Sequence, residues 1–572
     1  MKGSEAIIKT LIKQGVKLTF GIPGGAVIPL FDTFLDYQDR IKNILVRHEQ
    51  CAAHAADAYA RVSGKPGICI ATSGPGATNL VTGIMTAYMD SSPVIAFGGQ
   101  VPTSLIGNDA FQESDMIGIT MPITKHNFQV RNADEIIPTI MKAFKIATQG
   151  RPGPVYIDLP KDTQTGEIKT IPKEVHLPGF QPTLKGNLKQ IRRAAQLIIN
   201  SERPLFLIGG GVILSNASKE LYNLVELVKA PLVTTLMGKG AFPEQHPLCL
   251  GMLGMHGRKV ANYAIINADL IIAIGCRFSD RITGNLESFA ENAKIIHIDI
   301  DPAEIGKNIT AEVPIVGDAK LVIKDLITEI KKLSLKEKTA WVTRLKELNN
   351  LCECNLDRDE TPIHPLKLLH ELRKVIRDKD IVTTGVGQQQ MFAAHFIKRK
   401  YPRTFISSGG AGTMGFGLPA AIGAKTAKPE VEVFDLDGDG SFAMTQQELA
   451  TCKEENIKII SVIFNNAYLG MVRQWLELFF NKRYSNVHLA KTPDFAKLAE
   501  AYKLEGISIT RPSEILPALK DAIKNDETTV LDVHIHSEAN ILPMLPPGGH
   551  LKEAFGGCIP EKGKFFLSDK DD

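Results

Sequence analysis

Residues 438–466 read GDGSFAMTQQELATCKEENIKIISVIFNN, and this stretch decides the fold. The mainly apolar residues 431–436 just before it and 459–464 near its end predict two buried strands. Residues 444–455 have the composition of a helix, and Gly438, Asp439 and Gly440 predict a tight turn after the first strand. The unit is therefore βαβ. Asp439 and Asn466 follow the carboxyl ends of its two strands, where open α/β sheets bind ligands.

A carboxylate and an amide oxygen beside a glycine turn suit a Mg²⁺ ion that is shared with a diphosphate. Mg²⁺ takes few protein ligands and completes its shell with phosphate oxygens and water. Either the Asp-Gly or the Asn-Asn pair alone is also typical of an ordinary turn. Together, separated by the 24 residues 441–464, they resemble the fingerprint of the thiamin-diphosphate enzymes. The resemblance implies that Asp439, Asn466 and the backbone carbonyl of Tyr468 are the Mg²⁺ ligands.

The composition is that of an ordinary globular protein. A length of 572 residues suggests roughly three or four domains. Hydrophobic residues make up 44% and charged residues 23%, and a net charge of +3 gives no reason to expect nucleic acid or an anionic membrane as a partner. The eight cysteines are scattered, and Cys352 and Cys354 lack a second close pair for zinc, so we expect reduced thiols in a cytosolic protein.

No segment predicts targeting or membrane insertion. Residues 1–17 predict an amphipathic helix that enters a strand, without the apolar region and cleavage site of a signal peptide. No run of about 18 uncharged apolar residues occurs, so no transmembrane span is expected. These features predict a cytoplasmic protein without a membrane partner.

Three α/β blocks are separated by two polar connectors. The first block covers 1–162, the second 188–335 and the third 362–572, with a proline- and lysine-rich stretch after the first and a lysine-rich stretch at 331–338. Strands alternate with helices, which predicts an α/β fold of three doubly wound parallel-sheet domains. The resemblance implies that the first block binds the pyrimidine of the cofactor, the second a flavin, and the third the diphosphate.

Glu49 lies between a short predicted strand at 44–46 and an alanine-rich predicted helix at 52–60. A glutamate there commonly just complements the helix dipole. The surrounding residues 47–61, RHEQCAAHAADAYAR, resemble the corresponding segment of the acetohydroxyacid synthases, with Cys51 and Ala58 in place of two glycines. The resemblance implies that Glu49 hydrogen-bonds the cofactor pyrimidine and promotes loss of the C2 proton, which gives the reactive carbanion.

Four more residues of the first block match functional positions of that family. Phe111 and Gln112 match residues that face the substrate, and the Gln112 amide could stabilise a developing oxyanion. Arg151 matches a flavin contact and Lys161 a residue at the mouth of the active site. Phe111 as a core aromatic, and the two cations as solvated charges, remain open alternatives.

The second block carries glycine motifs. Gly209, Gly210 and Gly211 follow an apolar strand, which alone is a weak nucleotide signal. Residues 251–257, 275–281 and 297–302 resemble flavin-containing acetohydroxyacid synthases, although Ser279 replaces an aspartate and leaves one flavin contact open. His256 as an ordinary loop histidine also stays open. The FAD contacts implied by the resemblance are Arg151, Gly209, Gly210, Gly211, Leu253, Gly254, Met255, His256, Gly275, Arg277, Arg281, Asp299, Ile300, Gly317 and Asp318.

The third block contains Gly410-x-Gly412-x-x-Gly415, with Asp435 about 20 residues further on, as a dinucleotide fingerprint requires. Spacing alone therefore does not exclude a dinucleotide. The same strand runs into Gly438, however, which favours thiamin diphosphate. Met414 would support the bend of that cofactor, or it could be a core methionine. The implied cofactor contacts are Val386, Gly387, Gln388, Gln389, Gly412, Met414, Gly440, Ser441, Gly470 and Met471.

Residues 469–475, LGMVRQW, resemble the biosynthetic acetohydroxyacid synthases, although Leu476 departs from their pattern. Trp475 would narrow the pocket, so that the ethyl group of a second 2-keto acid packs better than a methyl group, an effect of about 1–3 kcal/mol.

The resemblance covers about residues 3–550 and implies a complete activity. Pyruvate loses CO₂, and the remaining unit is joined to a second pyruvate or to 2-ketobutyrate. Thiamin diphosphate, Mg²⁺ and a structural FAD serve as cofactors. It also implies a homodimer or a dimer of dimers, with Glu49 and Asp439 supplied by different subunits, and a small regulatory subunit.

Three alternatives stay open. A glyoxylate carboligase would lack Glu49. A pyruvate oxidase or sulfoacetaldehyde acetyltransferase would depart at Phe111, Gln112 and Trp475. A non-catalytic paralogue would lose Glu49 or the metal ligands.

Overall fold

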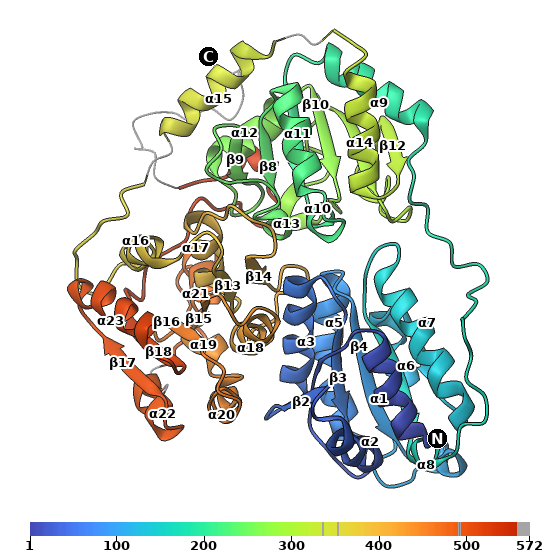
Figure 1. Ribbon diagram of the computed structural model, residues 1–572. Coiled ribbons are helices and arrows are strands. Elements are labelled where there is room, and N and C mark those ends of the chain that lie inside the picture. Colours follow the sequence, from blue (N-terminus) through green and yellow to red (C-terminus); the bar gives the residue numbers. More distant parts are fainter. Residues whose placement is uncertain (335–336, 352–353, 490, 492, 557–572) are drawn as a thin grey trace.

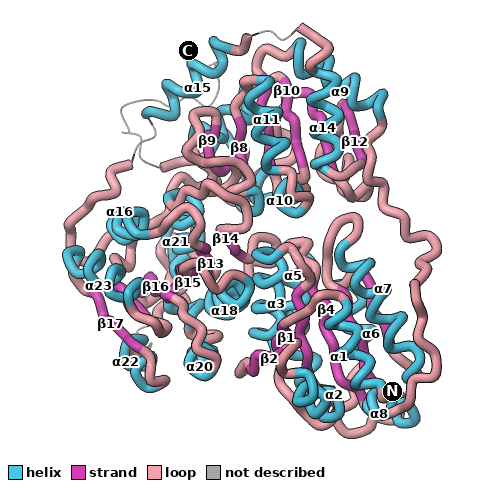
Figure 2. The backbone as a smooth tube through the Cα atoms, in the orientation of Figure 1, coloured by secondary structure: helices cyan, strands magenta, loops and turns pink. Residues whose placement is uncertain are grey.

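Three parallel sheets of six strands organise the chain in the computed structural model (Figure 1). The structure describes residues 1–556 apart from 335–336, 352–353, 490 and 492. The strand orders are β2-β1-β3-β4-β6-β5, β12-β11-β10-β7-β8-β9 and β14-β13-β15-β16-β18-β17. Helices lie against both faces of each sheet (Figure 2), which confirms the predicted α/β fold.

The first domain lies at the lower right of Figure 1. Its strands are β1 (Leu18–Gly21), β2 (Lys42–Leu45), β3 (Gly67–Ala71), β4 (Val94–Gln100), β5 (His126–Gln129) and β6 (Val155–Pro160). Its helices are α1 (Gly3–Lys13), α2 (Ile28–Phe34), α3 (Glu49–Ser63), α4 (Pro75–Asn79), α5 (Val81–Met89), α6 (Met116–Thr120), α7 (Ile136–Thr148) and α8 (Lys161–Thr165).

The second domain lies at the top of the same view. Its strands are β7 (Pro204–Ile208), β8 (Leu232–Thr234), β9 (Cys249–Met252), β10 (Leu270–Ile274), β11 (Lys294–Asp299) and β12 (Val313–Val316). Its helices are α9 (Leu188–Asn200), α10 (Gly211–Leu214), α11 (Ser218–Val228), α12 (Lys259–Asn267), α13 (Asp280–Thr283), α14 (Ala319–Ile330) and α15 (Thr339–Leu351).

The third domain lies at the lower left. Its strands are β13 (Ile381–Thr384), β14 (Phe405–Ser407), β15 (Val433–Gly438), β16 (Ile460–Asn465), β17 (Glu505–Ile509) and β18 (Thr529–His534). Its helices are α16 (Pro365–Val375), α17 (Gln388–Phe396), α18 (Gly417–Ala427), α19 (Asp439–Phe442), α20 (Leu449–Glu454), α21 (Gly470–Phe479), α22 (Phe495–Ala501) and α23 (Pro512–Lys524).

Each sheet lies within one predicted block. Two segments, however, pack on the second domain although the predicted boundaries place them outside it. Helix α15, beyond the predicted end at 335, adds Trp341, Leu345 and Leu348 to the core of the second domain. Leu545, in the tail of the third block, joins the same core, and its N–H donates to the Met255 carbonyl at 2.9 Å. Removing apolar tail residues such as Leu545 from water stabilises the folded protein, which favours packing of the tail on the second domain.

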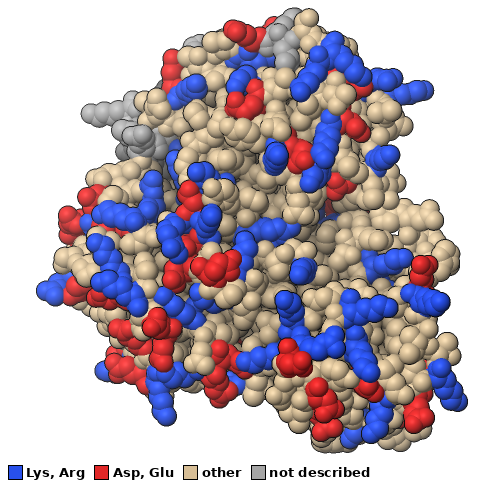
Figure 3. Space-filling view, viewed as in Figure 1, with Lys and Arg blue, Asp and Glu red and all other residues tan. Residues whose placement is uncertain are grey.

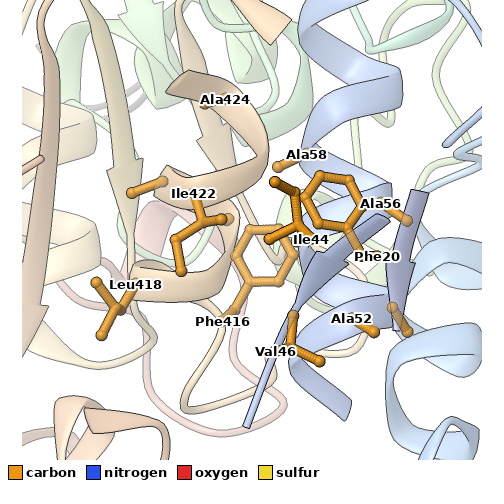
Figure 4. Close-up of a cluster of buried hydrophobic side chains, with 14 of the residues drawn as sticks. Phe20, Ile44, Val46, Ala52, Ala56, Ala58, Phe416, Leu418, Ile422 and Ala424 are labelled. Atoms are coloured by element: carbon orange, nitrogen blue, oxygen red, sulfur yellow. The ribbon is translucent and has the colours of Figure 1, made fainter. Parts of the chain in front are cut away.

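The first and third domains share one hydrophobic core, shown in Figure 4. Alanines on α3 lie beside Phe416, at the start of α18, and Leu418 and Ile422 on α18 belong to the same core. The helices touch closely because their contacting side chains are small. A Cβ atom added at Gly423 would lie only 2.0 Å from the Ala55 carbonyl oxygen. The first and third domains of each chain are therefore rigidly joined, which supports any function that needs both domains.

The helix predicted at 444–455 is confirmed only in part. Its first residues form a turn, and helical structure begins with the 3-10 turn η6 (Gln446–Glu448) and continues as α20. Thr445 directly precedes η6, and its hydroxyl donates to the Gly415 carbonyl at 3.0 Å. This contact with a distant loop replaces local helix geometry.

The thiols differ partly from expectation. Cys51, Cys69, Cys249, Cys276 and Cys452 are buried and free, but Cys354 is disulfide-bonded, whereas the sequence predicted only reduced cysteines.

Acidic and basic side chains are interspersed over the face shown in Figure 3. None of the helices in the described part of the chain has the length and apolarity needed to cross a bilayer.

Candidate active site

A pocket of about 80 Å³ lies at the carboxyl ends of β15 and β16. The strand ends and the glycine turn after β15 open this space, as parallel sheets commonly do for ligands. The predicted residues that line it are Val386, Gly387, Gln388, Gln389, Met414, Asp439, Gly440, Ser441, Asn466, Tyr468, Gly470 and Met471. The structure therefore brings together the three expected metal ligands and all but one of the expected thiamin contacts.

Asp439 is the first residue of α19 and is buried, and its Oδ2 atom has no hydrogen-bond partner among the described residues. Burial raises the pKa of Asp439 to about 7, although the backbone N–H groups of Gly440 and Asn466 oppose the shift. An unpartnered buried carboxylate oxygen calls for a cation or an unseen donor. The Asn466 side-chain oxygen accepts a hydrogen bond from the Tyr468 N–H at 3.0 Å. The three residues expected to bind the metal, Asp439, Asn466 and Tyr468, therefore lie together in the pocket lining. They fit an oxygen-preferring ion such as Mg²⁺.

The nine-residue helix α17 begins beside this pocket. Its N-cap is Gly387, with φ of 155°, and Gln388 and Gln389 form its first turn. Free N–H groups at a helix start attract anions such as phosphate. Gln388 is fixed by its amide, which donates to Gln474 Oε1 at 2.7 Å and to the Ala539 carbonyl at 3.0 Å.

The glycine-rich loop 409–415 does not offer its first amides to a ligand. The Gly409 and Gly410 N–H groups donate to the Asp90 carboxylate at 3.0 and 2.7 Å. A Cβ atom at Gly410 would lie 2.8 Å from Met89 Cβ. These two glycines allow close packing of the loop on the first domain, so their N–H groups are not free to bind phosphate as a dinucleotide fingerprint requires. Met414 is half-buried and lines the pocket, so it is no core methionine.

Glu49 opens α3 and is half-buried. Its Oε2 accepts a hydrogen bond from Asn79 Nδ2 at 2.9 Å, and a Cβ atom at Gly76 would lie 3.2 Å from its Oε1. Gln112 packs against the same loop, because a Cβ atom at Gly74 would lie 2.9 Å from the Gln112 carbonyl oxygen. Loop 72–79 thus brings Glu49 and Gln112 to one surface of the first domain.

Phe111 is 88% exposed, so the core-aromatic alternative is wrong. Lys161 is exposed at the start of α8, directly after β6. The described lining of the 80 Å³ pocket comes only from residues between 386 and 535. Glu49, Phe111, Gln112 and Lys161 therefore lie outside it within a single chain.

A cavity of about 1170 Å³ lies where all three domains meet. The predicted flavin residues that line it are Arg151, Gly209, Gly210, Gly211, Leu253, Met255, His256, Gly275, Arg277, Arg281, Asp299, Ile300 and Asp318, and Gly412 lines it too. Gly254 and Gly317 are not in this lining. Gly254 N donates to Asn262 Oδ1 at 2.9 Å, and a Cβ atom at Gly317 would lie 2.8 Å from Val322, so both serve packing.

The chemistry of the large cavity suits a dinucleotide with a diphosphate. A Cβ atom at Gly209 would lie 2.0 Å from the Gly275 carbonyl oxygen, so the backbone forms the cavity wall. Arg151 donates to Ser91 at 2.8 Å and to Glu304 at 2.7 Å, which fixes its position. Burial lowers the pKa of His256 to about 4, and its Nδ1 has no hydrogen-bond partner within the described part of the chain. These groups and the arginines fit FAD, and His256 is not an ordinary satisfied loop histidine.

The two cavities adjoin. Met414, Met471 and Val472 line both, and Trp475 lines the larger one, where it packs edge-on against Phe479 with ring centroids 5.5 Å apart. A ligand that extends from the Asp439 pocket across this junction into the larger cavity would therefore reach the wall to which Trp475 contributes.

The sequence interpretation missed Arg61 and Asp90, which also line the large cavity. Arg61 donates to Asp57, to Asp90 and to the Ser407 carbonyl, and so connects the first and third domains. The four-residue spacing of Asp57 and Arg61 on a helix is typical of an ion pair and was the one available signal.

Sequence comparisons place these domains in a known class. Residues 1–119 match the N-terminal TPP binding domain of thiamine pyrophosphate enzymes, 191–326 the central domain, and 385–533 the C-terminal TPP binding domain. Each matched segment lies in a different one of the three domains, and two of the segments are described as binding the cofactor.

Several relatives match nearly the whole chain. A probable acetolactate synthase large subunit of Methanocaldococcus jannaschii is 57% identical over 561 residues, covering 96% of this chain and 94% of the relative. One from Methanococcus aeolicus is 52% identical, with the same coverage of both chains. An acetolactate synthase of Mycobacterium leprae is 47% identical over 96% of this chain and 89% of the relative. The chain therefore belongs to the thiamine pyrophosphate enzymes and, within them, to the acetolactate synthase large-subunit family.

Proposed function

We propose that the protein is the catalytic subunit of an acetolactate synthase. It decarboxylates pyruvate and joins the remaining two-carbon unit to a second pyruvate or to 2-ketobutyrate, the first common step of branched-chain amino acid biosynthesis. One observation carries the proposal: the Asp439 pocket adjoins a dinucleotide-sized cavity that Trp475 lines. Family membership supports the same reaction.

Mg²⁺ is held by the Asp439 carboxylate, the Asn466 side-chain oxygen and the Tyr468 carbonyl. The unpartnered Asp439 Oδ2 supports this assignment. Gly387 and Gln388, at the start of α17, orient the diphosphate, and Met414 supports the cofactor from below. When bound, thiamin diphosphate supplies a nucleophilic carbon and accepts the electrons released on decarboxylation.

Residues of the first domain handle protons and charge. Glu49 holds the cofactor pyrimidine and takes part in proton transfer. The Gln112 amide donates to the oxyanion that develops on the substrate. Phe111 covers the reacting atoms, and Lys161 lies at the mouth of the site.

The active site is shared between two copies of the chain, in a homodimer or a dimer of dimers. Two observations support this arrangement: the Asp439 pocket has no lining residue from the first domain, and Phe111 is 88% exposed. Glu49 of one chain completes the site at Asp439 of the other. A small regulatory subunit belongs to the same proposal, because the two methanogen relatives are named large subunits.

FAD occupies the 1170 Å³ cavity and has a structural role, because joining two keto acids after loss of CO₂ involves no net redox change. The arginines and the buried, neutral His256 support this assignment.

The test is acetolactate formation from pyruvate by purified protein from which cofactors have been removed. We expect product only when thiamin diphosphate, Mg²⁺ and FAD are all restored, and added 2-ketobutyrate should divert product to 2-aceto-2-hydroxybutyrate. Full activity without FAD would contradict the flavin assignment. No acetolactate from protein with all three cofactors bound would contradict the proposed reaction.

A further inference from the structure

Glu448 lies in the third domain and reaches the start of α3 in the first. It ends the turn η6, and its side chain is fully buried. Its Oε1 accepts hydrogen bonds from the backbone N–H groups of Arg47 at 2.8 Å and His48 at 3.2 Å. These two residues directly precede Glu49, so a carboxylate from another domain holds the backbone that carries it.

The second oxygen of Glu448 is satisfied as well. Thr451 Oγ1 lies 2.7 Å from Oε2 and 3.2 Å from the Leu45 carbonyl oxygen. Burial raises the pKa of Glu448, and the hydrogen bonds from Thr451 and Arg47 oppose that shift. Because each oxygen of this buried carboxylate has a hydrogen-bond partner, the contact is a stable part of the fold and not a chance contact.

The contact takes the place of a common helix-start motif. His48 is the N-cap of α3, and its ring Nδ1 accepts from Gln50 N at 3.2 Å. In a capping box, a glutamate three residues after the N-cap would accept the N-cap N–H. That position is Cys51 here, which has no carboxylate. Glu448 supplies the missing acceptor from a distance of 400 residues along the chain.

Neighbouring charge pairs do not share this role. The Arg47 guanidinium pairs with Glu454 at 2.6 Å, but the Glu454 side chain is 60% exposed. Exposed pairs contribute little to stability. The pair with Glu454 thus holds only the Arg47 side chain, which also donates to the Leu45 carbonyl at 3.1 Å, whereas Glu448 holds the Arg47 and His48 backbone.

We propose that Glu448 is a positioning residue for Glu49: by accepting the Arg47 and His48 N–H groups, it sets where α3 begins and where the Glu49 carboxylate points. The inference rests on the proton-transfer role proposed for Glu49. Displacing a catalytic group by about 1 Å can lower the rate on the order of 100-fold, so such support matters for the rate.

Two near-isosteric variants separate oxygen position from charge. In Glu448→Gln the amide oxygen replaces Oε1, and the NH₂ group can donate to Thr451, whose hydroxyl can turn to Leu45. Glu448→Asp keeps the charge but withdraws the oxygens by one methylene. Glu454→Ala is the matched control, because it removes a partner of the same Arg47 through the exposed side chain.

Amide hydrogen exchange at Arg47 and His48, in protein free of cofactors, reads the contact directly. Losing the acceptor should speed exchange about tenfold in Glu448→Asp, while Glu448→Gln and Glu454→Ala stay close to wild type. In the reconstituted enzyme, kcat should fall roughly 10- to 100-fold for the aspartate variant alone, with KM for pyruvate little changed.

Unchanged exchange in Glu448→Asp, or faster exchange with undiminished kcat, would overturn the inference. So would a loss in Glu448→Gln as large as that in Glu448→Asp, because the charge or the general packing, and not the position of the accepting oxygen, would then decide. Failure of the role proposed for Glu49 appears in a different variant: Glu49→Gln would keep full carboligation while exchange at Arg47 and His48 stayed slow.

Discussion

The Asp439 carboxylate is buried with one oxygen that lacks a partner among the described residues, and burial raises its pKa to about 7. Such an arrangement destabilises the protein by itself and is common where a ligand supplies the missing charge. The glycine turn and the asparagine pair pointed to this site from the sequence because their spacing fixes two strand ends side by side.

Single-residue roles that depend on distant partners were out of reach of the sequence. Asp90 accepts from Gly409 and Gly410 across more than 300 residues, and no local pattern marks such a contact. Gly254 and Gly317 were assigned to the flavin by family resemblance, but they are not among the residues that line the large cavity. Which glycines line a cavity and which allow packing depends on tertiary structure.

Trp475 provides a test at the level of one side chain. Replacing Trp475 with leucine should widen the junction and lower the preference for 2-ketobutyrate over pyruvate as acceptor by about 10- to 100-fold, because packing against an ethyl group is lost. The product ratio with both acids present measures this preference.

Trp341→Phe serves as the control for Trp475→Leu. Trp341, the only other tryptophan, is buried in the second domain and donates to the Pro204 carbonyl, away from the junction. Its replacement should leave the product ratio unchanged. An unchanged ratio in Trp475→Leu would remove Trp475 from the acceptor site.

Elements with strong local signals were predicted well. Strands expected at 431–436 and 459–464 are observed as Val433–Gly438 and Ile460–Asn465. The helix expected at 52–60 extends over Glu49–Ser63, because His48 caps its start and Gly64, with φ of 73°, ends it. The helix expected at 444–455 begins only at Gln446, since Thr445 bonds to Gly415 in another part of the fold. Local patterns predict an element unless a tertiary contact competes.

Helix α3 carries an acid-sensitive side chain into the interface with α18. His54 is fully buried, with its ring 5.2 Å from that of Phe416, and burial lowers its pKa to about 3, helped by the charge of Arg61. The unfolded chain, with a histidine pKa near 6.5, binds this proton at higher pH than the folded one. The contribution of neutral His54 to the free energy of unfolding is fully present above about pH 6.5 and is lost as the pH falls toward 3.

His54→Leu, which cannot be protonated, should therefore weaken the acid sensitivity of the protein. Between pH 6.5 and 5 the wild type should lose up to about 2 kcal/mol of unfolding free energy more than the variant. Unfolding midpoints measured in urea at both pH values give the comparison. Equal losses in the two proteins would contradict the assignment of this acid sensitivity to His54.

At the scale of the molecule, carboxylates cross between the first and third domains in both directions. Asp90 holds the loop 409–415, and Glu448 holds the start of α3. The three blocks and their order could be predicted from alternating strands and helices. Their mutual packing, and the return of the tail to the second domain, could not, because these contacts join residues hundreds of positions apart.

The most direct measurement of the shared active site mixes two inactive chains, Glu49→Gln and Asp439→Asn, by co-expression. In each mixed dimer, one site has both substitutions and the other has neither. With random pairing, half of the dimers are mixed, so about a quarter of wild-type acetolactate formation should return. Each variant expressed alone should stay inactive. If the co-expressed chains also stay inactive although mixed dimers are isolated, Glu49 and Asp439 act within one chain and the account of a shared site is wrong.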